Sequence, residues 1–125
     1  MGARVVMISA RLAMSKANEF TKEDISMSIA QFTRFKSDKS EEMIAAAKEA
    51  KAIFERHGAE FLRLSRFHTG AWAGEWLAVT RYANWEVYGK VQEGVSKDPA
   101  FAKLAAHMRT IAELTGRNIA VGVDL

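Results

Sequence analysis

The sequence of 125 residues contains no cysteine, and no apolar run in it approaches the length of a membrane span. The first absence excludes a disulfide framework, a thiolate nucleophile and a zinc site with cysteine ligands. The second excludes a membrane-spanning helix, which needs roughly 18 consecutive apolar residues. No low-complexity tract or linker divides the chain. We therefore expect a cytoplasmic protein with one folded domain and no membrane partner.

Concentrated charge of one sign is also missing. The formal net charge is +3 and the isoelectric point is about 9.3, but lysine and arginine are scattered and interleaved with acidic residues. Phosphate binding needs basic side chains that are concentrated on one face, and a high isoelectric point alone does not supply such a face. We therefore expect no nucleic-acid partner.

The N-terminal stretch lacks a clear structural pattern. Residues 1–18 carry three basic side chains and no acidic one. We expect residues 1–24 to form a poorly specified arm, and residues 25–125 to form the domain. An extra edge strand, a weak targeting segment and sequence upstream of a later start at Met7 or Met14 remain open for the arm.

Periodicity predicts the order of elements in the rest of the chain. Alternating apolar residues predict strands at 25–35, at both ends of 59–82, and at 117–125. Apolar residues three or four apart predict a helix from residue 41 to a glycine end at Gly58, and a helical region over 84–116. Asn84 is expected to cap that region, and Pro99 is expected to restart it after a break near 96–98.

The stretch 59–82 is predicted to be a hairpin with its loop at 69–74. Placing Leu64 opposite Val79 separates the residues of the sheet into two faces. The first face is aliphatic: Ile25, Met27, Ile29, Leu62, Leu64, Leu77, Val79, Ile119, Val121 and Val123. The second carries the aromatic residues Phe61, Phe67, Trp76 and Tyr82, with Ser26, Ser28, Arg63, Ser65, Thr80 and Asp124.

The order strand, helix, strand, strand, helix, strand is that of a ferredoxin-like α+β domain. In this fold the helices cover one face of a four-stranded antiparallel sheet. The aliphatic face would meet the helices and leave four aromatic rings on the open face. Each ring buries about 150 to 250 Å², and monomers seldom expose a patch that large. We therefore expect a second copy of the chain to cover it, which makes the protein a homodimer.

The aromatic and glycine pattern resembles a known superfamily. Gly70, Gly74, Trp76, Tyr82, Trp85, Tyr88 and Gly89 are followed by the sequence Asp98-Pro99-Ala100-Phe101 and a last alternating strand. This succession is similar to that of the dimeric α+β barrel superfamily, which includes antibiotic-biosynthesis-type monooxygenases and the NIPSNAP-like and EthD-like proteins. The resemblance implies two sheets packed face to face around an interior that binds a small aromatic or acidic organic molecule. It also implies a monooxygenase-like enzyme that needs no cofactor.

The predicted site residues are drawn from the second face and its rim. Three are expected to be catalytic: Arg63, His68 and Tyr82. Six are expected to contact the substrate: Phe61, Ser65, Phe67, Trp76, Thr80 and Asp124. Arg63 would hold a carboxylate, enolate or phenolate, unless it pairs with Asp124 or a partner subunit. His68 is either a base at the cavity mouth or an ordinary rim residue.

Haem and metals are not expected. Some relatives in the superfamily degrade haem with an asparagine, a tryptophan and a histidine. Trp76 and His107 match two of these residues, but the first strand offers Gln31 and no asparagine. No histidine belongs to a pair with metal-ligand spacing.

Two further functions remain open from the sequence. A non-catalytic structural or ligand-binding dimer would use the same face as packing surface. An RNA-binding module of the RRM kind shares the order of elements and stacks bases on sheet aromatics. In the third strand, however, Trp76 and Tyr82 are separated on their face by Ala78 and Thr80, and the RRM signature is lacking.

Overall fold

A computed structural model describes residues 28–125 of the chain. The elements are β1 (Ile29–Lys36), α2 (Ser40–Arg56), β2 (Phe61–Arg66), β3 (Trp76–Tyr82), α3 (Trp85–Ser96), α4 (Pro99–Ile111) and β4 (Glu113–Val121). The arm predicted at 1–24, and Ile25, Ser26 and Met27 of the first predicted strand, lie outside the described residues.

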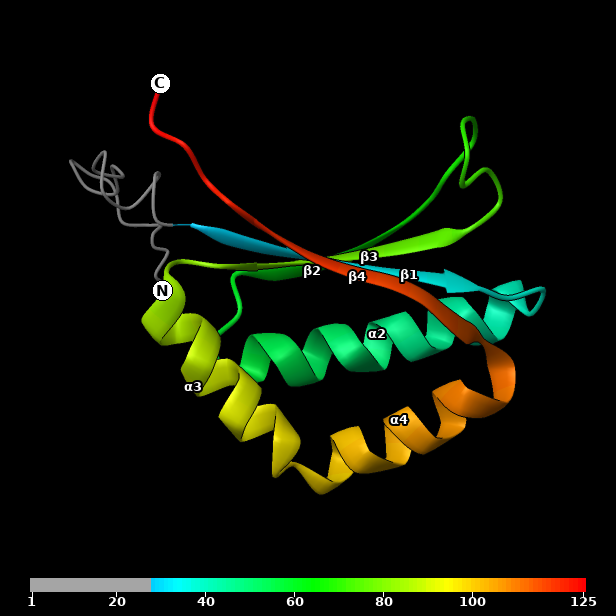
Figure 1. The fold of residues 1–125 in the computed structure, drawn as a ribbon. Coiled ribbons are helices and arrows are strands. Elements are labelled where there is room, and N and C mark those ends of the chain that lie inside the picture. Colours follow the sequence, from blue (N-terminus) through cyan, green and yellow to red (C-terminus); the bar gives the residue numbers. More distant parts are fainter. Residues whose placement is uncertain (1–27) are drawn as a thin grey trace, which may run out of the picture.

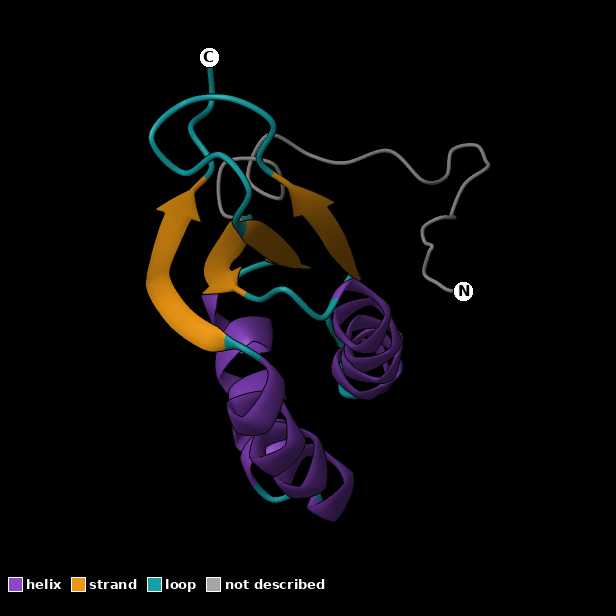
Figure 2. Ribbon diagram, turned by 90° about the vertical axis from the view of Figure 1, so that its right-hand side faces the viewer, coloured by secondary structure: helices purple, strands orange, loops and turns teal. Residues whose placement is uncertain are grey.

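The four strands form one antiparallel sheet in the order β2-β3-β1-β4. All three described helices lie on the same face of this sheet, and none of them lies on the other face (Figures 1 and 2). The predicted ferredoxin-like α+β fold is therefore confirmed for the described residues. We call the face away from the helices the open face.

Local signals place the helix ends close to where the sequence predicts them. The Asn84 side chain accepts a hydrogen bond of 2.8 Å from the Val87 amide at the start of α3. Asp98 does the same for the Ala100 amide at 2.9 Å, and Pro99 occupies the first turn of α4. The prediction that the second helix runs to Gly116 is wrong, since α4 ends at Ile111 and the following residues pair with β1.

The predicted register of the hairpin is wrong by one residue. Leu64 lies opposite Ala78, and Arg63 lies opposite Val79. A shift of one residue moves every side chain of a strand to the other face relative to its neighbour. Trp76, Thr80 and Tyr82 therefore face the helices, where their exposed fractions are 6%, 7% and 0%.

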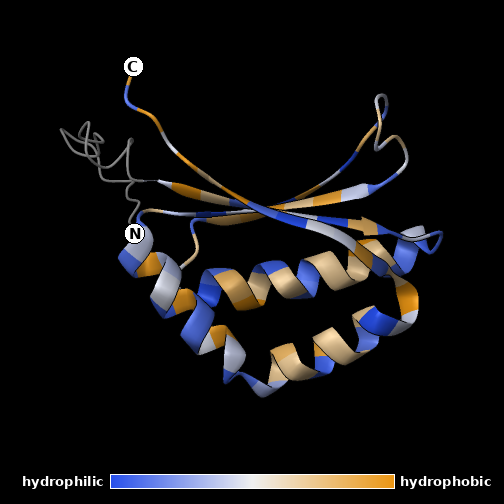
Figure 3. Ribbon diagram, in the orientation of Figure 1, coloured by the Kyte–Doolittle hydropathy of each residue, from blue (hydrophilic) through white to orange (hydrophobic). Residues whose placement is uncertain are grey.

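The hydrophobic core lies between the sheet and the helices, and apolar residues recur along α2 and α4 (Figure 3). Its most deeply buried side chains are Tyr82, Ile29, Met43 and Val91. Trp76 donates its indole N–H to the Ser37 carbonyl at 3.2 Å, and the Tyr82 hydroxyl accepts a hydrogen bond of 3.0 Å from Gln92. The polar atom of each ring thus has a partner on the helix side.

Five apolar residues of the predicted aliphatic face lie elsewhere than expected. Leu77 and Val79 point to the open face because of the corrected register. Ile119 and Val121 share the helix-facing side with Gln31 and Ile29, but 43% and 47% of their surface is exposed. Val123, beyond the end of β4, is 73% exposed. The helices therefore cover the β2 and β3 side of the sheet better than its β4 edge.

Candidate site on the open sheet face

The open face is organised in rows that run across the sheet. The strand pairings give three rows in the order β2, β3, β1, β4: Phe61, Arg81, Ala30 and Ala120; Arg63, Val79, Phe32 and Asn118; Ser65, Leu77, Arg34 and Gly116. Phe32, Phe61, Leu77 and Val79 are half-buried, although no described helix lies above them. The face thus combines an apolar floor with three arginines.

A charged cluster lies at one end of this face. Glu75, just before β3, is 9% exposed, and its Oε1 atom receives two hydrogen bonds. One comes from the Arg34 Nε at 3.3 Å and the other from the Thr115 hydroxyl at 2.7 Å. Arg34 also donates from Nη2 to the Thr115 carbonyl at 3.0 Å. Three segments distant in sequence therefore converge on one ion pair.

A β-bulge in β4 creates the place for this cluster. Arg34 pairs with Gly116 and Phe35 pairs with Leu114, so Thr115 is an extra residue between them. Bulges redirect side chains and backbone groups in this way, often beside functional sites. Gly116 leaves room for the guanidinium, because a Cβ atom there would lie 2.7 Å from the Arg34 Nη2 atom.

Trp72, in the hairpin loop, covers the cluster. The Arg34 guanidinium carbon lies 3.9 Å from the centroid of the Trp72 ring, a cation–π distance. Phe67 supports Trp72 edge-on, with ring centroids 5.5 Å apart. The loop rises on the open side of the sheet (Figure 1). Glycines at 70 and 74 adopt φ angles of 92° and 89°, which favour glycine and make this loop path available.

Comparisons with known proteins bear on the fold. No protein-family model matches the sequence, and the comparison with curated proteins gave no significant match. Solved structures do match. A NIPSNAP family protein from Agrobacterium tumefaciens has a TM-score of 0.65 at 12% identity, over 86% of this chain and 93% of that one. SnoaB, a cofactor-independent oxygenase from Streptomyces nogalater, has a TM-score of 0.61 at 15% identity, over 79% and 96%.

A third structure is a putative antibiotic biosynthesis monooxygenase from Chloroflexus aurantiacus. It has a TM-score of 0.56 at 11% identity, over 77% of this chain and 93% of that one. The chain therefore has the ferredoxin-like α+β fold of these proteins. This likeness confirms the fold that the resemblance in the sequence implies, and identities this low show the fold alone.

Four predicted site residues lie on the open face of the sheet. Phe61, Arg63 and Ser65 alternate along β2, and Phe67 follows in the same direction. The Arg63 guanidinium carbon lies 4.1 Å from the centroid of the Phe61 ring, and Arg63 makes no ion pair with another residue among those described.

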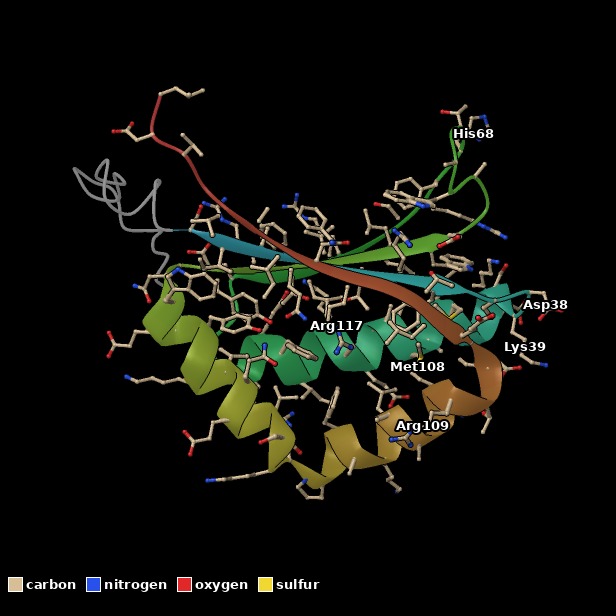
Figure 4. The ribbon with its side chains drawn as sticks, viewed as in Figure 1. Asp38, Lys39, His68, Met108, Arg109 and Arg117 are labelled. Carbon is tan, nitrogen blue, oxygen red and sulfur yellow. The ribbon has the colours of Figure 1, made fainter. Side chains whose placement is uncertain are left out.

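The other predicted site residues do not join this group. His68 lies exposed in the hairpin loop (Figure 4). Asp124 follows β4, which is the edge strand at the opposite side of the sheet from β2. Three strand spacings separate the two edge strands, which is a distance of about 14 Å. Trp76, Thr80 and Tyr82 belong to the helix-facing core, so their expected placement in the pocket is wrong.

The environment of Tyr82 agrees with a core position. Burial is the main cause that raises the pKa of its hydroxyl from 10.0 to about 12, and the hydrogen bond from Gln92 opposes this rise. The ring also packs edge-on against Tyr88, with centroids 5.0 Å apart. The hydroxyl is therefore protonated at neutral pH and is committed to a partner on the helix side.

The cluster of Arg34, Trp72, Glu75 and Thr115 was not predicted from the sequence. One signal was available, since Glu75 is a charged residue that directly precedes the apolar run of the third strand. The bulge at Thr115 leaves no comparable signal, because periodicity does not reveal which strand carries an extra residue.

A surface cleft of about 850 Å³ opens at the adjacent end of the sheet. It lies between the turn 36–39, the hairpin loop and the end of α4, and Glu75 reaches its wall. Four basic residues line it: Lys36, Lys39, Arg66 and Arg109. Asp38 and Glu113 also line it. Among the described residues no group of His, Cys, Asp and Glu is arranged to hold a metal ion, and no helix is long and apolar enough to cross a membrane.

Proposed function

We propose that two copies of this chain pack their open faces together, and that the enclosed interior binds a small aromatic or acidic organic molecule. The observation that carries this proposal is the composition of the open face. Half-buried Phe32, Leu77 and Val79 lie beside arginines on a sheet face that no described helix covers. Apolar surface of this kind is more stable when a partner removes it from water.

A second copy is the partner that this surface fits. The fold matches subunits of dimeric α+β barrels over most of the length of both chains. The apolar floor supplies the contact area, and the charged rows keep part of the face polar. Binding sites for small molecules combine apolar walls with a few polar groups in this way.

We further propose that the protein acts on its ligand as a cofactor-independent monooxygenase. In such a reaction the substrate, deprotonated to an enolate or phenolate with its proton passed to water, is itself the reductant of O2. One oxygen atom enters the substrate, which is oxidised to the quinone level, and the other leaves as water. The chain's part would be to bind the anion and orient it, with Arg63 and Ser65 among the contacts and Phe61 and Phe67 as walls. SnoaB supports this reading as a cofactor-independent oxygenase of similar fold.

Oxygen consumption tests the enzymatic part. Purified protein, treated with a chelator, is mixed with a panel of polyphenols and followed with an oxygen electrode. The proposal predicts saturable oxygen uptake that depends on folded protein and falls at least tenfold in Arg63→Gln. Uptake unchanged in this variant, or absent with every polyphenol, would contradict a monooxygenase that uses Arg63.

One observation favours a second candidate, a ligand-binding dimer without catalysis. His68 is exposed in the hairpin loop and Tyr82 is buried on the helix side, so two of the three residues predicted to be catalytic lie outside the strands' open face. This candidate predicts saturable ligand binding by a dimer with no oxygen uptake. The two experiments together separate it from the enzyme.

A further inference from the structure

The hydrogen bonds of Arg34 leave part of its guanidinium unused. Nε binds Glu75 and one N–H of Nη2 binds the Thr115 carbonyl. Among the described residues, no partner is found for Nη1 or for the second N–H of Nη2. These remaining groups form the outer fork of the guanidinium. A fork of two parallel N–H donors matches the two oxygens of a carboxylate.

Stability alone is a weak explanation for this cluster. The Arg34 side chain is only 15% exposed and that of Glu75 only 12%. Removing an ion pair from water costs free energy, and apolar residues of similar size often stabilise a fold as well or better. Yet several separate features serve to hold Arg34 in place: the bulge at Thr115, the missing side chain of Gly116, and the Trp72 ring.

The surroundings of Arg34 favour a planar ligand. Its guanidinium lies against the Trp72 ring, and Trp72 in turn contacts the Phe67 ring. In the sheet, Arg34 pairs with Leu77, next to Phe32 and Val79 in the neighbouring row. An aromatic ring would thus find apolar surface beside Arg34. Among the described arginines of the open face, Arg34 is the one that donates hydrogen bonds both to β4 and to the residue before β3.

We propose that Arg34 is the carboxylate-binding residue of the open face, and that the ligand is a small aromatic carboxylate whose ring packs beside Trp72. Glu75 and Thr115 are positioning residues, because they hold the guanidinium so that its outer fork stays available. The assignment rests on the proposed function in one respect, namely that the paired open faces enclose this ligand. Arg63, which is exposed and lies against Phe61, keeps the part given to it above, contact with the enolate or phenolate of the substrate.

Binding of simple probes tests the assignment. Benzoate and 2-naphthoate are titrated into the full-length protein and followed by calorimetry and by tryptophan fluorescence, with benzamide as the uncharged probe of similar shape. We expect saturable binding of at least one carboxylate, and at least tenfold weaker binding of benzamide. No saturable binding of either carboxylate, or equal binding of benzoate and benzamide, overturns the assignment.

Two pairs of variants locate the site. Arg34→Lys keeps the charge but loses the planar fork, and we expect carboxylate affinity to fall about tenfold. Its matched control is Arg117→Lys, since Arg117 lies on the helix-facing side of the same sheet (Figure 4). Gly116→Ala should displace the Arg34 guanidinium and weaken binding similarly. Its control is Gly89→Ala, where an added Cβ atom would meet nothing within 4 Å.

The same samples separate this assignment from the proposed function. A dimer in which Arg34→Lys and Gly116→Ala both bind the carboxylate like wild type overturns the assignment and leaves the pairing of open faces intact. A wild-type monomer that binds benzoate, with the loss expected in both variants, overturns the pairing and supports the assignment. Should Arg34→Lys fail to fold, Gly116→Ala decides alone, because it keeps every charged group of the cluster.

Discussion

The Arg34 guanidinium carbon lies 3.9 Å from the centre of the Trp72 ring, and a Cβ atom at Gly116 would lie 2.7 Å from the Arg34 Nη2 atom. The Arg34 Nε atom is bound to Glu75 at 3.3 Å. At this end of the open face the cation is thus mostly buried and paired with a carboxylate, whereas Arg63 on β2 is exposed.

Glu75→Gln should destabilise the protein. The variant removes the carboxylate that binds Arg34 and the Thr115 hydroxyl, and hydrogen bonds to charged groups contribute about 1.5 to 3 kcal/mol. We expect the free energy of unfolding, measured in urea, to fall by about that amount. Glu49→Gln on the exposed side of α2 is the control and should change it by less than about 0.5 kcal/mol. Equal stability of the two variants would show that the cluster is not held as described.

Trp76→Ala and Trp72→Ala should differ strongly in stability. Trp76 is 6% exposed in the core, and truncation of a buried aromatic ring costs about 3 to 5 kcal/mol. Trp72 is 45% exposed, and loss of its contact with Arg34 should cost less than about 2 kcal/mol. Urea unfolding of both variants measures the difference. A larger loss for Trp72→Ala would contradict the corrected hairpin register.

Tyr82 should make the protein less stable at high pH. Its pKa is raised from 10.0 to about 12 in the folded state, mainly by burial. Between these two values the unfolded chain loses the proton while the folded chain keeps it, so the free energy of unfolding falls as the pH rises. Urea unfolding from pH 9 to 12 should show a steeper fall for wild type than for Tyr82→Phe. Parallel curves for the two proteins would rule out a buried, protonated Tyr82.

Asp98 should make the protein less stable as the pH falls into the acidic range. Its pKa is lowered from 3.8 to about 2, first by the hydrogen bond with His57, then by the Ala100 amide and Arg56. The stability that depends on its charge is present above pH 3.8 and is lost as the pH falls towards 2. Asp98→Asn keeps the helix cap, so its melting temperature should lie below that of wild type at pH 7 and approach it at pH 2. A difference that does not depend on pH would contradict this account.

The order of elements could be predicted because each helix and strand carries its own periodicity and end signals. Asn84 and the Asp98-Pro99 pair fixed the starts of α3 and α4, and both caps are present in the structure. The end of α4 was predicted too late. Leu114 and Thr115 follow Ile111 at the spacing of three and four residues that is typical of a helix. In the structure, however, this segment pairs with β1 and belongs to the sheet.

The faces of the sheet could not be predicted with the same certainty. The strand from Trp76 to Tyr82 has large apolar side chains on both faces, so a shift of one residue exchanges two plausible cores. Polar atoms on distant segments determine which face of this strand meets the helices. Ser37 receives the Trp76 N–H and Gln92 donates to the Tyr82 hydroxyl, and both lie on the helix side. The cluster around Arg34 could not be predicted for the same reason, because its residues come from segments that are distant in sequence.

The mass of the protein in solution tests the pairing of open faces most directly. Size-exclusion chromatography with light scattering is applied to wild type and to Val79→Lys, which places a charge in the middle of the open face. Ala52→Lys on the exposed side of α2 is the control. We predict about twice the chain mass of 13.9 kDa for wild type and the control, and the single chain mass for Val79→Lys. A monomeric wild type, or a Val79→Lys variant that stays dimeric, would contradict the account.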